Sequence, residues 1–253
     1  MIKADGIIKR FGDNTVLRGV DFIFDEGKTN LIIGKSGAGK TVFLKILVGL
    51  FEPTDGAVWY DDINLCCISR AELRDLRMQI GMLFQGNALF DSMTVEENIR
   101  FPLDMFTKLT LGEKLRKVNF CLERVSLEGS NHKYPSEISG GMQKRVGIAR
   151  AIVLDPKYLF CDEPNSGLDP KTAITIDELI SGITKDNNIT TVINTHDMNS
   201  VMEIGDKICL LSEGELAWAG GKGEVFNSDN ETLVNFIFAS PFLQRLRKQA
   251  LTH

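Results

Sequence analysis

The sequence lacks the long hydrophobic runs that membrane-spanning proteins need. Nowhere in its 253 residues do about 18 apolar residues follow one another, the length that a membrane-spanning helix requires. The opening residues, Met1 to Gly6, also lack the unbroken apolar stretch of a signal peptide. We therefore expect the chain on its own to be soluble.

Metal-binding cysteine patterns and positive charge are scarce as well. The five cysteines form no C-x-x-C pair and have no histidines at zinc-binding spacing, so we expect reduced cysteines, most of them packed as small hydrophobic residues. Acidic residues outnumber Lys and Arg by 34 to 29, giving a net charge of −5, which argues against nucleic acid as a partner. Two basic clusters are local exceptions, which we interpret as solvated helix faces rather than polyanion or lipid-surface sites: Lys144, Arg145 and Arg150, and Arg245, Arg247 and Lys248.

Alternating strand and helix patterns predict an α/β fold with a mixed, largely parallel sheet. Between Thr94 and Val153 the hydrophobic period becomes helical, so residues from about 86 to 153 are predicted to form a helical insert. We assign residues 1–230 to one domain and residues 231–253 to a C-terminal helical extension. The predicted strands are 6–9, 16–24, 29–33, 57–60, 80–84, 158–162, 189–195 and 207–211, and the predicted helices include 42–50, 172–183 and a stretch with the apolar stripe Leu111, Leu115, Val118, Leu122 and Val125.

A phosphate-binding loop follows the strand 29–33. Its residues fit the pattern G-x-x-x-x-G-K-[ST] in full, and Val42 continues into a helix. Small residues let successive backbone N–H groups turn toward phosphate oxygens at the N-terminus of a helix. Lys40 is expected to reach the β and γ phosphates of a nucleotide, and Thr41 to place its hydroxyl on Mg²⁺. The loop comprises Gly34, Lys35, Ser36, Gly37, Ala38, Gly39, Lys40 and Thr41.

Two carboxylates end the later apolar strand 158–162. Asp162 is predicted to hold Mg²⁺, directly or through water, and Glu163 to polarise the water that attacks the γ-phosphate. Without the phosphate loop, a strand that ends in solvated acids would explain these residues equally well. The loop and the acids together predict nucleotide hydrolysis.

A serine and two glycines begin another helix, in the segment Ser139-Gly140-Gly141-Met142-Gln143. Such a helix start exposes N–H donors to an anion, although by itself it is more often a simple cap. Together with the preceding motifs it resembles the signature LSGGQ of the ATP-binding-cassette (ABC) ATPases, over nearly the whole chain. The resemblance implies a P-loop NTPase fold of the ABC nucleotide-binding type, with a mixed sheet core and a helical insert subdomain.

The resemblance also implies roles for single residues. Phe11 matches the aromatic residue that stacks on adenine, and Gln85 matches a glutamine that touches Mg²⁺ and links the core to the helical insert. His196 matches a switch histidine at the γ-phosphate, and Asp169 belongs to a loop that crosses a dimer interface. In that family Ser139, Gly140, Gly141 and Met142 of one copy would close on the ATP held by Lys40 of another, which implies a homodimer.

Met142 stands where most members of the family have glutamine. This form, and the segment 86–95, resemble the ATPases of Mla/Mce-type systems, which move phospholipids or other lipids between bacterial envelope membranes. The implied partners are an integral membrane permease and an Mce-domain lipid-binding protein. The implied location is the cytoplasmic face of the bacterial inner membrane.

Two alternatives remain open. The first is the ATPase subunit of an importer or exporter of another small solute, because the cargo site would lie in the partner. The second is a soluble cassette protein that acts on DNA or ribosomes. It is disfavoured because the chain has one cassette and no long coiled coil before the signature.

Overall fold

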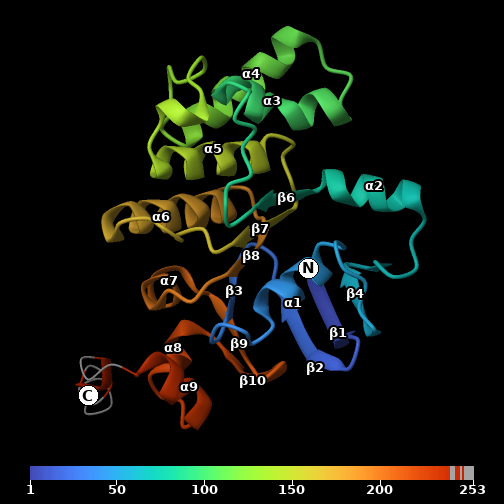
Figure 1. Cartoon of the computed structure of the whole chain (residues 1–253), viewed down its shortest axis with the longest axis vertical. Helices are drawn as coiled ribbons and strands as arrows, with labels where there is room; N and C mark the ends of the chain where they lie inside the picture. Colours follow the sequence, from blue (N-terminus) through green and yellow to red (C-terminus); the bar gives the residue numbers. More distant parts are fainter. Residues whose placement is uncertain (240–242, 246, 248–253) are drawn as a thin grey trace.

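The main sheet has six strands in the order β10-β9-β3-β8-β7-β6 in the computed structural model, which describes residues 1–239, 243–245 and 247 (Figure 1). The strands from β9 to β6 are parallel to their neighbours, and β10 is antiparallel to β9. The predicted mixed, largely parallel sheet is therefore confirmed. Its strands are β3 (Thr29–Ile33), β6 (Ile80–Leu83), β7 (Tyr158–Asp162), β8 (Thr190–Asn194), β9 (Lys207–Ser212) and β10 (Glu215–Gly220).

A second sheet of four strands, in the order β2-β1-β4-β5, lies beside the main one. The prediction that the strand near 57–60 belongs with the main sheet was wrong, because β4 pairs antiparallel with β1. A two-residue turn at Gly12 and Asp13 joins β1 to β2 and lets the other edge of β1 receive β4. The strands are β1 (Ile2–Phe11), β2 (Asn14–Phe24), β4 (Asp55–Tyr60) and β5 (Ile63–Asn64).

The residues predicted as a helical insert form α3 (Val95–Phe106), α4 (Leu111–Arg124), the short 3₁₀ helix η1 (Pro135–Glu137) and α5 (Gly140–Ile152). They occupy one end of the molecule, at the top of Figure 1, with α8 (Lys222–Val225) and α9 (Glu231–Ile237) at the other end. The predicted capping box of Thr110 and Glu113 is present at the start of α4. The predicted apolar stripe is buried only in part: Leu111 is 59% exposed, and full burial on α4 begins at Val118.

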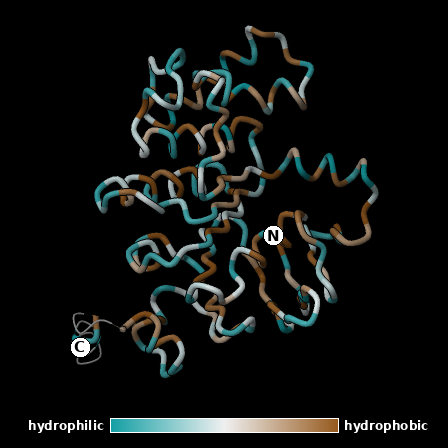
Figure 2. Tube along the Cα trace, in the orientation of Figure 1, coloured by the Kyte–Doolittle hydropathy of each residue, from teal (hydrophilic) through white to brown (hydrophobic). Residues whose placement is uncertain are grey.

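The main sheet separates two hydrophobic cores because successive strand residues point to opposite faces. Leu159, Cys161 and Ile193 face the core shared with α5 and α6 (Pro170–Asp186). Phe160 and Val192 face the core shared with α1 (Lys40–Leu47), β1 and β2. Figure 2 shows hydrophobic stretches along the central strands and the helices that cover them. Both faces of the sheet are covered, so a ligand can reach the sheet only at its edges. In open α/β sheets ligands bind at the carboxyl ends of the strands.

Several short elements were not predicted: α2 (Arg70–Met78), α7 (Met198–Ile204), α8 (Lys222–Val225) and β10. The C-terminal extension contributes α9 (Glu231–Ile237), whose Leu233 and Ile237 are buried in the core with α6. The rest of the predicted tail helix, including Phe242 and Leu246, falls largely outside the described residues.

Within the described residues, no helix combines the length and the apolar character needed to cross a membrane. Of the cysteines, Cys121, Cys161 and Cys209 are buried free thiols, whereas Cys66 and Cys67 are exposed.

Candidate functional site

The phosphate-binding loop connects β3 to α1 at the carboxyl edge of the main sheet. Gly34 and Gly39 have φ angles of 147° and 99°, which residues other than glycine rarely adopt. A Cβ atom on Gly34 would lie 2.3 Å from the carbonyl oxygen of Leu211, and one on Gly39 would lie 2.8 Å from the side chain of Leu17. The path of the loop is therefore fixed by close packing against β9 and β2.

The Lys40 side chain turns back into this loop. Its Nζ donates to the carbonyl oxygens of Gly34 at 2.9 Å and Lys35 at 3.2 Å, and the residue is only 8% exposed. Burial lowers the pKa of Lys40, while the nearby carboxylates of Glu163 and Asp162 act to raise it. The ammonium group is thus a buried cation held inside the loop, and its contact with the β and γ phosphates stays a prediction.

Asp162 and Thr41 are linked through a third residue, Asn194. Asn194 Nδ2 donates to Asp162 Oδ1 at 2.5 Å and to Thr41 Oγ1 at 3.3 Å. Burial raises the pKa of Asp162, and the hydrogen bond from Asn194 opposes that shift. The motifs in the sequence predict Asp162 and Thr41 as metal ligands but assign no role to Asn194.

The oxygen atoms of Thr41 and Asp162 fit the preference of Mg²⁺ for hard ligands. Over the described part of the chain, no three His, Cys, Asp or Glu side chains come together as a metal cage. Mg²⁺ commonly binds through one or two protein oxygens, water and the phosphates of a nucleotide, and these residues suit that mode. Bound there, Mg²⁺ would neutralise charge on the phosphates.

Glu163 and His196 form a direct contact. His196 Nδ1 lies 2.6 Å from Glu163 Oε2, and the His196 side chain is 66% exposed against 13% for Glu163. The Glu163 backbone has a φ of 52°, in the left-handed region, and its N–H donates to the carbonyl oxygen of Asn194 at 2.9 Å. This unusual backbone directs the carboxylate toward His196 instead of continuing strand β7.

A cleft of about 850 Å³ lies over the phosphate loop, and every loop residue except Ala38 lines it. Its other lining residues are Val42, Gln85, Glu163 and His196, together with two residues that the sequence did not point to, Val16 and Phe236. Asp162 does not line this cleft. Phe236 comes from α9, about 200 positions along the chain from the loop, so no local pattern could have found it.

Phe11 does not line this cleft. It ends β1, is 45% exposed, and packs edge-on against Phe51 with a 5.8 Å separation of ring centroids. The Lys9 amine lies 5.0 Å from the Phe11 ring centroid. Stacking of Phe11 on adenine stays a prediction.

Gln85 is tied to the helical end of the molecule by Lys144. Lys144 Nζ donates to the carbonyl oxygen of Gln85 at 2.6 Å, and Arg150 donates to the carbonyl oxygens of Asn87 and Ala88, each at 2.6 Å. The prediction that Lys144 belongs to a solvated face was wrong, because the residue is 3% exposed and burial lowers its pKa. These cations satisfy the carbonyl groups of a non-helical segment that lies against α5.

The signature residues lie away from the cleft of their own chain. Ser139 caps α5, accepting a hydrogen bond on Oγ from the N–H of Met142 at 3.3 Å, and both Ser139 and Gly140 are exposed. Asp169 likewise caps α6 and accepts from the Thr172 hydroxyl at 2.5 Å. Among the described residues that line the cleft, none belongs to 139–142 or is Asp169.

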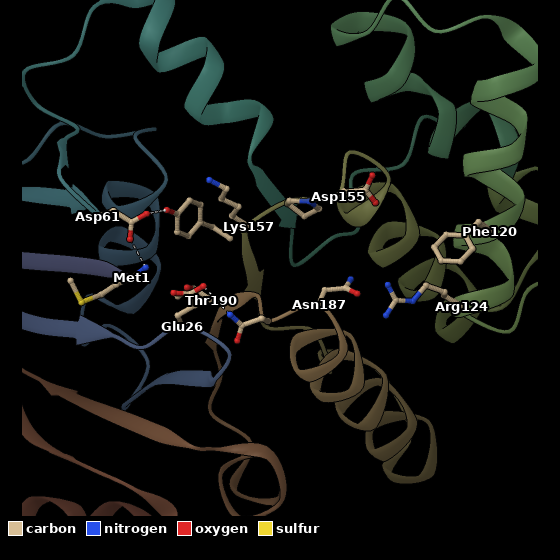
Figure 3. A pocket seen from close by; sticks show the side chains of 12 residues that line it. Met1, Glu26, Asp61, Phe120, Arg124, Asp155, Lys157, Asn187 and Thr190 are labelled. Atoms are coloured by element: carbon tan, nitrogen blue, oxygen red, sulfur yellow. Dashed lines mark hydrogen bonds and ion pairs between the residues drawn. The ribbon is translucent and has the colours of Figure 1, made fainter.

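A second hollow, of about 640 Å³, lies at the opposite ends of β7 and β8 (Figure 3). Its wall includes Tyr158, whose hydroxyl donates to Asp61 Oδ2 at 2.8 Å, and the Met1 amine, which donates to Asp61 Oδ1 at 2.7 Å. Lys157 and Arg124 also line the hollow, on opposite sides of it in Figure 3. No residue of the predicted nucleotide site lines this hollow, so the two are separate.

Comparison with known proteins agrees with the ATP-binding-cassette motifs in the sequence. The ABC transporter family model matches residues 17–166. A probable ribonucleotide transport ATP-binding protein, mkl, of Mycobacterium leprae is 38% identical over 93% of this chain and 68% of its own length. A methionine import ATP-binding protein, MetN, of Campylobacter jejuni is 38% identical over 96% of this chain and 77% of its own length. The chain spans about two thirds of the length of the mycobacterial relatives.

Solved structures agree. The ATP-binding cassette MJ0796, in a dimeric post-hydrolysis state bound to ADP and Pi, has a TM-score of 0.80 and 31% identity, and covers 88% of this chain and 99% of its own. The cbiO1 protein of Clostridium perfringens, part of the ABC transporter complex cbiONQ, has a TM-score of 0.83 and 29% identity over 98% of both chains. Because the family model covers more than half of the sequence and these relatives align over most of it, the chain belongs to the ABC transporter family as an ATP-binding subunit, and it is an ATPase.

Proposed function

We propose that the chain powers the transport of lipid, most specifically phospholipid, between bacterial envelope membranes. It acts as a homodimer on the cytoplasmic face of the inner membrane, bound to an integral membrane permease that works with an Mce-domain lipid-binding protein. The observation that carries this proposal is Met142 in the signature, together with the segment 86–95, since both resemble the Mla/Mce-type ATPases.

Met142 stands at the start of α5, where its N–H is bonded to Ser139 and its partly buried side chain packs on the helical core. The side chain therefore supports the start of the helix. A lipid would be recognised in the membrane partner, and Met142 supports the proposal by subgroup resemblance.

Within the site we propose that Glu163 acts as the general base for the attacking water and that His196 contacts the γ-phosphate. Lys40 is the counter-charge for the β and γ phosphates. Thr41, Asp162 and Gln85 hold Mg²⁺, whose charge offsets that of the phosphates. The short contact of Glu163 with His196 and the burial of Lys40 inside the loop support these roles.

We propose further that two copies of the chain complete each site. Ser139 and Asp169 are exposed and lie outside the cleft of their own chain, so they are free to meet the nucleotide and the loop of a second copy. The dimeric state of the related cassette MJ0796 supports this arrangement.

A second candidate is an ATPase subunit that drives import of a small solute. The relatives named for methionine import and for ribonucleotide transport favour it, because their identity to this chain extends over more than nine tenths of its length. The described clefts give no further preference, since the cargo site would lie in the permease.

Reconstitution would test the choice. The chain would be purified with the permease encoded beside it and placed in liposomes, with Glu163→Gln as the inactive control. Movement of labelled phospholipid that requires ATP and is lost in the control is the expected result. Transport of methionine or a ribonucleotide, with no movement of lipid, would favour the second candidate, and a chain that binds no membrane protein would reject both.

A further inference from the structure

Asn194 occupies a buried position where three parts of the site meet. It is the last residue of β8 and is 0% exposed. Its side chain contacts Asp162 at the end of β7 and Thr41 on α1, and its backbone carbonyl accepts the N–H of Glu163. One residue thus contacts two of the three predicted metal ligands, Asp162 and Thr41, and the predicted general base.

The orientation of the Asn194 amide follows from chemistry. An ionised carboxylate only accepts hydrogen bonds, so the NH₂ group of Asn194 must face Asp162. The carbonyl oxygen Oδ1 then points elsewhere, and it is buried with no hydrogen-bond partner. Leaving a buried acceptor unpaired destabilises a protein, whereas an apolar residue of similar size would not. Only the two hydrogen bonds that the NH₂ group donates offset the cost of this unpaired oxygen.

The NH₂ group of Asn194 is shared between two residues of the site. Its two contacts, 2.5 Å to Asp162 Oδ1 and 3.3 Å to Thr41 Oγ1, set how far apart these oxygens lie before a nucleotide arrives. Residues behind metal ligands commonly fix their orientation in this way. We propose that Asn194 is a positioning residue that holds Asp162 and Thr41 ready for the Mg²⁺ of bound ATP.

The proposal separates metal-dependent from metal-independent binding. Lys40 and the N–H groups of the loop would hold the phosphates with or without metal, whereas Asp162 and Thr41 act only through Mg²⁺. Loss of Asn194 should therefore reduce the gain in affinity that Mg²⁺ provides and leave the affinity in EDTA nearly unchanged.

The experiment compares Asn194→Val with the parent protein, using calorimetric titration of a non-hydrolysable ATP analogue in Mg²⁺ and in EDTA. We expect the ratio of the two affinities to fall by about 10- to 100-fold, as for other residues that orient metal ligands. Ile193→Val, one position earlier and equally buried, is the matched control. It should melt at a lower temperature than the parent and keep the parent's ratio of affinities in Mg²⁺ and EDTA.

An unchanged ratio in Asn194→Val would overturn the proposal, as would an equal loss of affinity in Mg²⁺ and EDTA, which indicates a merely structural role. If Asn194→Val fails to fold, Asn194→Ser provides the same measurement. Serine keeps a donor but is too short to reach both partners, so the ratio should still fall, and a parental ratio in that variant would also reject the proposal.

Discussion

His196 Nδ1 lies 2.6 Å from Glu163 Oε2, and both side chains line the cleft that contains the phosphate loop. Because they act on the same reaction step in our proposal, their effects should not be independent. Glu163→Gln is expected to bind ATP but to hydrolyse it about 10²–10⁴-fold more slowly, with closed dimer accumulating. Phosphate release and size-exclusion chromatography with ATP would measure both effects.

The same pair permits a double-mutant cycle. His196→Ala alone should also slow hydrolysis, and the double variant should be little slower than Glu163→Gln, because residues that act as a unit are non-additive. Fully additive losses would show that the contact has no catalytic meaning.

Lys40→Ala should weaken ATP binding strongly, because the buried counter-charge of the phosphates disappears. The melting temperature of the nucleotide-free protein should change much less than the ATP affinity. The reason is that burial disfavours the charged form of Lys40 and lowers its pKa, so the folded protein gains little from this ammonium group. Nucleotide titration and thermal melting would separate the two effects. Parental affinity and turnover in this variant would mean that the loop has been misinterpreted.

Asp162 predicts a dependence of stability on pH. Burial raises its pKa above the usual value of 3.8, so the folded protein holds this proton more tightly than the unfolded chain does. The resulting cost is absent below pH 3.8, develops as pH rises toward the folded-state pKa, and is fully present above that pKa.

Asp162→Asn removes this cost and keeps an oxygen that accepts from Asn194. The nucleotide-free variant should therefore melt above the parent at pH 7, by about 2–4 °C for each kcal/mol recovered. The difference should narrow as pH falls toward 4, while Mg²⁺-dependent ATP binding is lost at every pH. Melting curves at several pH values check this, and a gap that stays constant would contradict the assignment of the shift to Asp162.

The C-terminal extension should matter for stability. Truncation after Ser228 removes α9, whose Leu233 and Ile237 are buried, and Phe238, which is 2% exposed. Each fully buried side chain of this kind contributes about 1.5–3 kcal/mol, so the melting temperature should fall by roughly 10 °C or more.

Truncation after Ala239 is the control: it keeps α9 and loses the hydrogen bonds of Arg247 to Phe226 and Ser228. Equal stability of the two truncated forms would show that α9 is dispensable.

Local chemistry explains which parts of the site were predictable. The phosphate loop and the pair Asp162 and Glu163 follow from contiguous residues, because a strand, a glycine-rich turn and a helix start suffice to place them. The four-stranded second sheet was missed, since strand pairing depends on partners far apart in the chain. Lys144 was misjudged for a similar reason, because its acceptor, the carbonyl of Gln85, lies on another element.

The sequence by itself determined that this protein binds a nucleoside triphosphate and hydrolyses it, because each motif for that chemistry is short and its geometry is local. Only the tertiary structure decided which groups meet. It brought Phe236 of α9 to the phosphate loop, paired His196 with Glu163, and placed the Asn194 amide between Thr41 and Asp162. These contacts join the ends of different strands and helices, and their distances depend on how the whole sheet packs.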